Sequence, residues 1–343
     1  MTYDTKESAL HFLNAYPRHR WLWKLGSMTI MSLTGVLSRG FLYGFHNVKT
    51  TGLNEFLETL DRSRLDKRTM LTVSNHISVI DDPLIWGLMP LNRMFDPKKL
   101  RWSLGAANIC FGTKFTSWFF SMGQVLATYR FGAGPYQGSV DSAIHLLSSP
   151  SPSKPFQFPD RPLVSQWVHI FPESLVHQAY PPHKTTMKYF HWGVSRLILE
   201  SASIPVIVPI FHNGLQDVFP EDREKWKYLP RTVIFPKLSK SKRLNLSFAF
   251  GNPLPDDYFA TERAEWSNIP LDQYDGDAAR KLRSKVAAKL RKAVISARSL
   301  LDLPEEDPRL KDPAFWAAVD ESSGIKTAGK YAINPVKVIE KEG

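Results

Sequence analysis

The residues best suited to chemistry lie in one short string, Ser74 to Pro83 (SNHISVIDDP), in which His76 and Asp81 are separated by four residues. A histidine paired with a carboxylate can act as a general base. The carboxylate fixes the imidazole tautomer and stabilises the imidazolium when the other ring nitrogen takes a proton. This spacing alone is common by chance, and the alternative interpretation is a helix-capping aspartate beside an ordinary polar histidine.

A strand followed by a bend is needed to position this pair. In one continuous helix, residues at this spacing would point about 140° apart. The flanking residues instead favour a strand from Met70 to Ser74 and a helix that opens at Pro83, with Asp82 as its N-cap. His76 is therefore predicted just past the strand end, facing Asp81 across the turn.

The sequence disfavours a covalent acyl-enzyme. Gly193 to Leu197 (GVSRL) lacks the second glycine of a G-x-S-x-G nucleophile elbow. The only cysteine, Cys110, cannot form an internal disulfide or a cysteine-based zinc site. Five further histidines have no metal-ligand spacing and are interpreted as structural or exposed: His169, His177, His183, His191 and His212. We therefore predict that no metal or other cofactor takes part, and that His76 activates a substrate hydroxyl for direct attack on a carbonyl.

Polar side chains that follow other predicted strands are candidates for the same site. Arg130 and Glu173 each come after a strand, and Arg196 lies on the helix after Glu173. Ligand sites of open α/β sheets gather at the carboxyl ends of strands, so His76, Arg130 and Glu173 are expected together. An arginine there can hold a phosphate through two hydrogen bonds. For Arg130 and Arg196 the alternative is an Arg–Glu pair that braces the fold.

Strands alternating with helices across residues 70–250 predict an α/β domain in which helices flank a mixed sheet. The expected strands are 70–74, 124–129, 166–171, 204–210, 231–235 and 244–250, and the expected helices are 51–67, 106–122, 188–201 and 277–301. Pro205 and Pro209 place their strand at an edge or an end. The Pro- and Ser-rich stretch 148–162 is interpreted as a surface insertion.

The two ends of the chain differ from this domain. Segment 21–45 is apolar and aromatic, but the uncharged stretch between Lys24 and Arg39 has only 14 residues, whereas a spanning helix needs about 20. We predict a re-entrant or in-plane membrane anchor, with a buried core helix as the alternative. The helix at 277–301 carries eight Lys or Arg opposite an apolar side. It is expected either to dock on its own domain or to rest on anionic lipid.

Three regions follow from these features. They are an N-terminal helix with an interfacial anchor (1–48), a catalytic domain (49–301) and a partly ordered C-terminal tail (302–343). The formal charge of +11 favours an anionic partner, which by charge alone could be a phospholipid surface, nucleic acid or acidic protein. Ten Trp and 21 Phe suit either a membrane interface or a large aromatic core.

Four strings in order resemble the successive blocks of the glycerolipid acyltransferase superfamily: NHISVID, GQVLATYR, HIFPES and IPVIVP. Further strings resemble one branch of it, the phospholipid–lysophospholipid transacylases: NHISVIDDPLIWG, AANICF, WVHIFPE, HWGVSRLI and PVIVPIFHNGLQDVFP. Together they are distributed over residues 71–220.

The resemblance implies a glycerol-3-phosphate acyltransferase-like fold and a monotopic enzyme on an anionic membrane surface, with phospholipid rather than nucleic acid as its partner. It implies CoA-independent exchange of acyl chains among cardiolipin, monolysocardiolipin and phosphatidylcholine, on the inner and outer mitochondrial membranes facing the intermembrane space. The alternatives are an acyl-CoA-dependent lysophospholipid acyltransferase and, less favoured, a non-catalytic peripheral lipid-binding protein.

The same resemblance implies roles for residues. His76 is the base and Asp81 its orienting partner. The glycerophosphate part is expected to be bound by residues from the other blocks: Asn75, Arg130, Glu173, Ser174 and Arg196. Ser174 stands where the superfamily usually has glycine, which puts close backbone approach to a phosphate in question. No arginine follows shortly after it, which disfavours an acceptor with a terminal phosphate and favours the transacylase branch.

Overall fold

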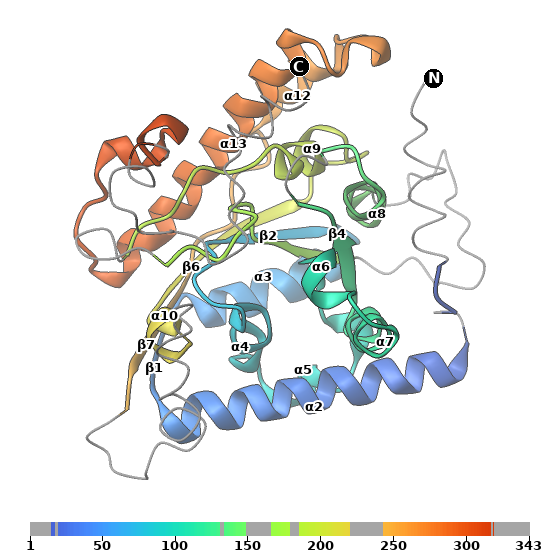
Figure 1. Cartoon of the computed structure of the whole chain (residues 1–343), viewed down its shortest axis with the longest axis vertical. Coiled ribbons are helices and arrows are strands. Elements are labelled where there is room, and N and C mark those ends of the chain that lie inside the picture. Colours follow the sequence, from blue (N-terminus) through green and yellow to red (C-terminus); the bar gives the residue numbers. More distant parts are fainter. Residues whose placement is uncertain are drawn as a thin grey trace.

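The computed structural model describes residues 15–17, 20–130, 134–148, 166–178, 185–219, 243–316 and 318. A seven-stranded sheet with the order β1-β7-β6-β2-β5-β3-β4 forms its middle layer (Figure 1). The strands are β1 (Asn47–Thr51), β2 (Met70–Ser74), β3 (Trp102–Ala106), β4 (Val125–Thr128), β5 (Trp167–Ile170), β6 (Val206–Asn213) and β7 (Asn245–Phe250). The strand expected at 231–235, and the insertion at 148–162 beyond Ser148, lie outside the described residues.

The sheet is mixed, as predicted. Neighbouring strands run parallel, except that β7 is antiparallel to β6. The prolines predict that the 204–210 strand lies at an edge or that they fall at its end. The edge is wrong, because β6 pairs with β2 on one side and with β7 on the other, whereas the position at an end holds for Pro205. Pro205 precedes the strand, and Pro209 lies one residue before Ile210, where pairing with β7 begins. Pro209, which has no backbone N–H to donate, therefore lies at the end of the β6–β7 hydrogen-bond ladder.

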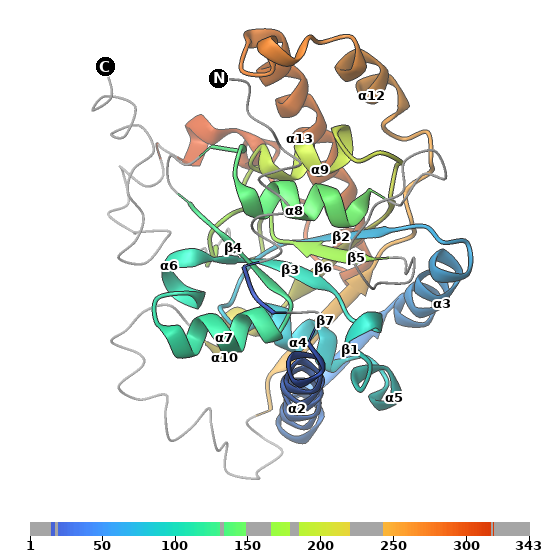
Figure 2. The same cartoon turned by 90° about the vertical axis from the view of Figure 1, so that its right-hand side faces the viewer.

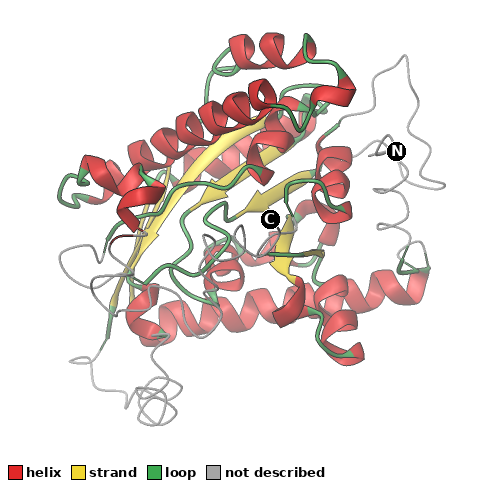
Figure 3. Ribbon diagram, turned by 45° about the horizontal axis from the view of Figure 1, so that its top comes forward, coloured by secondary structure: helices red, strands yellow, loops and turns green. Residues whose placement is uncertain are grey.

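Helices cover both faces of the sheet (Figures 2 and 3). They are α2 (Trp21–Phe45), α3 (Leu53–Leu65), α4 (Asp81–Gly87), α5 (Leu91–Met94), α6 (Ala107–Cys110), α7 (Lys114–Met122), α8 (Gly138–Leu147), α9 (Gly193–Leu199), α10 (Leu215–Val218), α12 (Ala260–Ser267) and α13 (Asp277–Arg298). Side chains alternate along each strand, so Leu71 and Val73 of β2 join a core with α8, α9 and α13, whereas Met70 joins one with α2, α3 and α4.

Two helix predictions need correction. The single helix expected at 106–122 is instead the end of β3, then α6 and then α7. The break has a local cause, because the Thr113 side chain accepts a hydrogen bond from the N–H of Thr116 and begins a new helix through a capping box. The helix expected at 188–201 begins only at Gly193.

The apolar N-terminal segment forms one continuous helix, α2, that lies along the domain (Figure 1). Small polar residues on its inner face bond to the domain: Ser27 Oγ donates to the carbonyl of Met122 (2.6 Å), and Ser32 Oγ to that of Met94 (3.0 Å). Its outer face exposes large apolar side chains: Trp21, Leu22, Leu25, Met28, Leu33, Val36, Leu37 and Tyr43. Within the described part of the chain, no helix combines the length and apolarity that a membrane crossing requires.

The C-terminal basic helix α13 docks on its own domain, which was one of the two expectations. Three of its arginines are buried, and Arg291 pairs with Glu306 (2.7 Å). The packing continues beyond residue 301, because Leu310 and Trp316 are also buried. The first part of the expected tail is thus packed against the domain.

The contact of α2 with α4 can be tested at Gly87. A Cβ added there would lie 2.8 Å from the Cβ of Ser38 on α2, whereas one added at Gly44 of α2 would meet nothing within 4 Å. We expect Gly87→Val to lower the free energy of unfolding by about 1 to 3 kcal/mol. The control Gly44→Ala should leave it unchanged or raise it by up to about 1 kcal/mol. Urea denaturation measures both, and equal effects would contradict the close helix crossing.

Candidate active site

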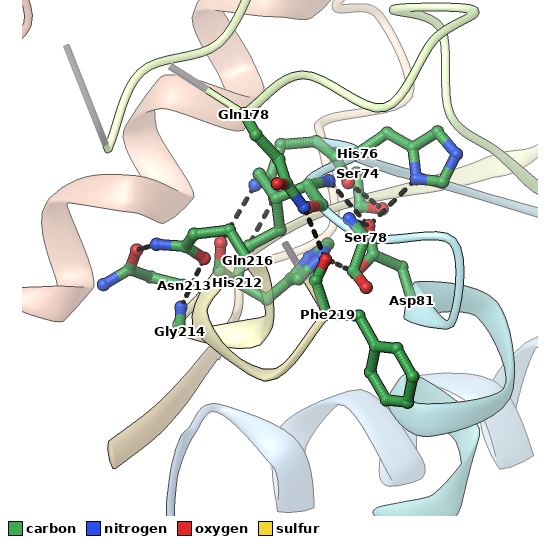
Figure 4. Close-up of polar contacts among 12 residues, drawn as sticks. Ser74, His76, Ser78, Asp81, Gln178, His212, Asn213, Gly214, Gln216 and Phe219 are labelled. Carbon is green, nitrogen blue, oxygen red and sulfur yellow. Dashed lines mark hydrogen bonds and ion pairs between the residues drawn. The ribbon is translucent and has the colours of Figure 1, made fainter. Parts of the chain in front are cut away.

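The structure brings His76 and Asp81 together where β2 gives way to α4 (Figure 4). Nδ1 of His76 lies 2.9 Å from Oδ2 of Asp81, and the same oxygen accepts the backbone N–H groups of Ile77 (2.7 Å) and Ser78 (2.9 Å). The His76 side chain is 21% exposed and the Asp81 side chain 0%. The bend therefore presents the imidazole and buries the carboxylate that orients it.

The predicted N-cap role of Asp82 is wrong. The helix already begins at Asp81, and Ile80 at the N-cap makes no side-chain cap. Asp82 instead accepts a hydrogen bond from Nε1 of Trp86 (2.9 Å) and forms an ion pair with Arg101. Burial alone would raise the pKa of Asp82, but Arg101 outweighs it and holds that pKa below its ordinary value. Asp82 thus ties α4 to the residue that precedes β3.

A second histidine contacts the carboxylate, and the sequence analysis missed it. His212 is fully buried on β6, and its Nε2 lies 3.1 Å from Oδ1 of Asp81. The side chain of Asn75 accepts the N–H of His212 and donates to its carbonyl, both at 2.9 Å. The strand predicted at 204–210 ends two residues before His212, and the lack of metal-ligand spacing groups this residue with the structural histidines. Its position just after a predicted strand, where ligand sites of α/β sheets gather, is the signal that could have found it.

Asp81 is held in its ionised form. Burial alone would raise the pKa of Asp81, but His212 and then His76 outweigh it and hold that pKa well below its ordinary value. A charged carboxylate is what the dyad needs in order to stabilise an imidazolium. Neighbouring His169 is unsuited to act as a base near neutral pH, because burial lowers the pKa of His169 to about 3.

Glu173 braces the loop that carries the dyad. It follows β5 and is buried; Oε1 accepts the N–H of His76 and Oε2 the N–H of Lys188, both at 2.8 Å. Burial raises the pKa of Glu173 to about 8, against the opposing effect of these two backbone N–H groups. Glu173 therefore lies beside His76 as predicted, with both oxygens directed to the backbone.

Ser174 has a φ of +61°, in the left-handed region. Glycine adopts this conformation without strain, whereas a serine there costs about 1 kcal/mol. The backbone shape thus explains why glycine suits this position in the superfamily. In this chain Ser174 adopts the same left-handed backbone conformation although it carries a side chain.

Arg130 follows β4 and reaches the same edge of the sheet. Its guanidinium donates to the carbonyl of Ser174 and to Oδ1 of Asn108, both at 3.2 Å. Phe171, which precedes this turn, stacks on the His76 ring with centroids 4.4 Å apart. Arg130 is thus connected to the dyad through this loop, as the strand-end argument predicted.

Arg196 does not join the other site residues. It is fully buried on α9, where it bonds to Asp141 and to the carbonyl of Pro135, both at 2.9 Å, and to Glu200 at 2.6 Å. Its guanidinium also stacks over Tyr136, 4.5 Å from the ring centroid. This is the bracing arrangement that the sequence analysis gave as the alternative for Arg196.

Residues 47–213 match the acyltransferase family, and this range contains the dyad, Arg130, Glu173 and His212. In the described part of the chain, no group of three or more His, Cys, Asp or Glu side chains is placed to hold a metal ion. Fold, dyad and family match define an acyltransferase.

Similarity to individual proteins narrows the class. The chain is 38% identical to tafazzin of Saccharomyces cerevisiae over 353 residues, covering 94% of this chain and 90% of the yeast protein. It is 36% identical over 198 residues to taffazin of Dictyostelium discoideum (57% of this chain, 62% of that protein). It is 33% identical over 198 residues to tafazzin of Drosophila melanogaster (58% and 47%). The chain belongs to the tafazzin family.

The raised pKa of Glu173 predicts a pH dependence of stability. The ordinary pKa of 4.5 applies to the unfolded chain and about 8 to the folded one. The contribution of Glu173 to folding is therefore fully present below pH 4.5 and is lost as the pH rises to about 8. The free energy of unfolding of wild type relative to Glu173→Gln should fall as urea titrations move from pH 5 to pH 8.

Glu262 provides the control, because it is buried as well. Burial alone would raise the pKa of Glu262, but hydrogen bonds, the strongest from Lys289, together with the charges of Lys289 and Lys285 outweigh it and lower that pKa. The difference between wild type and Glu262→Gln should stay level over the same pH range. A level difference for Glu173→Gln would contradict a raised pKa at that position.

Proposed function

We propose that this protein is a CoA-independent phospholipid–lysophospholipid transacylase that remodels the acyl chains of cardiolipin. The observation that carries the proposal is the dyad. Asp81 holds Nδ1 of His76, so the other ring nitrogen, Nε2, is directed to the substrate on a partly exposed ring. That arrangement suits a base that activates a hydroxyl.

The reaction is an ester exchange. Nε2 of His76 takes the proton of the lysophospholipid hydroxyl while that oxygen attacks the ester carbonyl of the donor phospholipid. The tetrahedral intermediate then expels the donor's glycerol oxygen, which takes the proton back from the imidazolium. One ester forms as one breaks, so neither an energy source nor a cofactor is consumed. Asp81 stabilises the imidazolium during the transfer.

The phosphate end of the lipid is assigned to Arg130. It lies at the edge where the dyad is exposed, and a guanidinium can bind phosphate through paired hydrogen bonds. Ser174 shapes the turn that orients it. We assign Asn75 and Glu173 to positioning, because their side chains bond the backbones of His212 and His76. Arg196 is left out of the site.

The proposed substrates are monolysocardiolipin as acceptor, and phosphatidylcholine or cardiolipin as donor. The proposed location is the inner and outer mitochondrial membranes, facing the intermembrane space. Membership of the tafazzin family and the absence of an arginine shortly after Ser174 support this assignment.

We propose that the enzyme rests in the membrane plane through α2 and α7. The outer face of α2 is apolar, and Phe115 and Trp118 of α7 are 79% and 51% exposed. The rings of buried Trp23 and Trp118 lie 5.2 Å apart, so α2 and α7 are in direct contact. An apolar groove of about 370 Å³ also lies along α2, lined by Met28, Thr29, Ser32, Leu33, Val36 and Phe95. The exposed apolar side chains of α2 and α7 and the apolar groove beside them suit contact with lipid.

Acyl exchange without CoA is the decisive test. Pure protein is incubated with phosphatidylcholine carrying labelled acyl chains and with monolysocardiolipin, in the absence and presence of acyl-CoA. We expect label in cardiolipin without CoA, and a loss of about a thousandfold in His76→Ala. The control His145→Ala changes a half-buried histidine of α8, in the opposite helix layer, and should keep its activity.

Three results would contradict parts of this proposal. Strict dependence on acyl-CoA would identify an acyl-CoA-dependent lysophospholipid acyltransferase. Vesicle binding without transfer under either condition would indicate a non-catalytic lipid-binding protein. Full activity in a folded His76→Ala variant would remove the dyad from the mechanism.

Membrane seating is tested separately by vesicle flotation. Leu25 and Leu33 on the outer face of α2 are 48% and 56% exposed, and Leu271, which precedes α13, is 76% exposed. The double variant Leu25→Glu and Leu33→Glu should bind phosphatidylcholine–cardiolipin vesicles at least about tenfold more weakly, because each change removes apolar area that lipid would cover. Leu271→Glu should bind as wild type. Equal loss in both proteins would argue against α2 as the membrane face.

A further inference from the structure

The carboxylate of Asp81 is contacted by two histidines, His76 in the bend after β2 and His212 on β6, and the exchange mechanism uses only His76. We propose that His212 is a positioning residue, which holds Asp81 in the orientation that His76 needs through its contact with Oδ1. The inference rests on the proposed function only in taking His76 as the base. It adds a third side chain to the dyad.

The two oxygens of Asp81 have very different surroundings. Oδ2 receives Nδ1 of His76 and the N–H groups of Ile77 and Ser78. Oδ1 has Nε2 of His212 at 3.1 Å, within ion-pair distance, although the two atoms are not aligned for a hydrogen bond, and no other described group bonds this oxygen. The side chain is 0% exposed, so bulk solvent does not reach it. Without His212, the Oδ1 atom of the buried Asp81 carboxylate would lose its nearest polar neighbour.

The ring of His212 has no polar contact in the described residues other than Asp81. Both ring nitrogens are buried, and neither makes a hydrogen bond of good geometry. Nε2 is the nitrogen within ion-pair distance of Asp81. A proton on Nε2 would therefore face the carboxylate, so the ring can support Asp81 from within the fold.

The position of His212 is itself constrained. Both polar groups of the Asn75 side chain bond the backbone of His212 at 2.9 Å, and the His212 ring stacks on Phe248 with an interplanar angle of 13°. Asn75 directly precedes His76 in the chain. His212, which supports the carboxylate, is therefore tied to Asn75, the residue next to the base, across the β2–β6 pair.

This arrangement predicts a specific kinetic effect. His76 is stabilised as an imidazolium only if Oδ2 stays aligned with Nδ1, and a loose Oδ1 lets the carboxylate turn away. Without His212 the transition state is stabilised less well, so kcat falls, whereas lipid binding and therefore KM are unaffected. A residue that only supported the fold would change the amount of active protein and its thermal stability instead.

The test uses His212→Leu and His212→Gln in the CoA-free exchange assay. We expect kcat of His212→Leu to fall about ten- to a hundredfold, which is the usual effect of losing a polar contact with a buried charged group, with KM unchanged. His212→Gln should retain more activity, because its amide N–H can still approach Asp81. The control His46→Gln changes another buried histidine, at the end of α2, and should keep both parameters.

A double-mutant cycle keeps the proposal testable if His212→Leu folds poorly. Asn75→Ala releases the backbone of His212, so its kcat should fall while KM stays level. Combining it with His212→Gln should then cost less than the product of the two single effects, because both act through one contact. Thermal unfolding reports the folded fraction of each variant.

Wild-type kcat in folded His212→Leu would overturn the positioning role, as would equal losses in the Leu and Gln variants or independent effects in the cycle. A raised KM in Asn75→Ala with unchanged kcat would assign Asn75 to lipid binding and contradict the proposal. Failure of the proposed function gives a different result, namely full activity in His76→Ala. An inactive His76→Ala with a fully active His212→Leu would refute only this inference.

Discussion

The charge on Asp81 is the constraint on which the rest of the site depends. A fully buried carboxylate is unfavourable unless several groups compensate it. Here the compensation comes from two backbone N–H groups of the bend, from His76 beside it and from His212 on another strand. The bend, the start of α4 and the register between β2 and β6 must therefore all be correct at once for this charge to be compensated.

Much of this could be predicted from the sequence because the relevant signals are local. The strand at 70–74, the amphipathic α3 and the long α13 follow directly from the spacing of apolar side chains. The approach of His76 to Asp81 follows from a bend within one string. Arg130 and Glu173 follow from the general rule that parallel strands end at the same edge. These inferences needed no knowledge of which strand lies beside which.

The errors arose where strand order or a competing local contact decides. β6 is interior although it contains Pro209, because the proline falls where one ladder ends. His212 joins Asp81 only because β6 pairs with β2, and sequence spacing carries no trace of a contact across 131 positions. Asp82 resembles an N-cap, but Asp81 takes the N–H groups of the bend and leaves Asp82 to Arg101. In each case a tertiary partner outweighs a correct local preference.

The short helix α4 has a consequence for how the two ends of the enzyme communicate. Asp81 begins this helix and Gly87 ends it, where it packs directly against Ser38 of α2. A rigid element of seven residues thus connects the buried charge at one end with the long helix of apolar outer face at the other. A displacement of α2 against α4 would therefore move the same short helix that begins at Asp81. The proposed membrane face and the proposed catalytic carboxylate are thus joined through about two turns of helix.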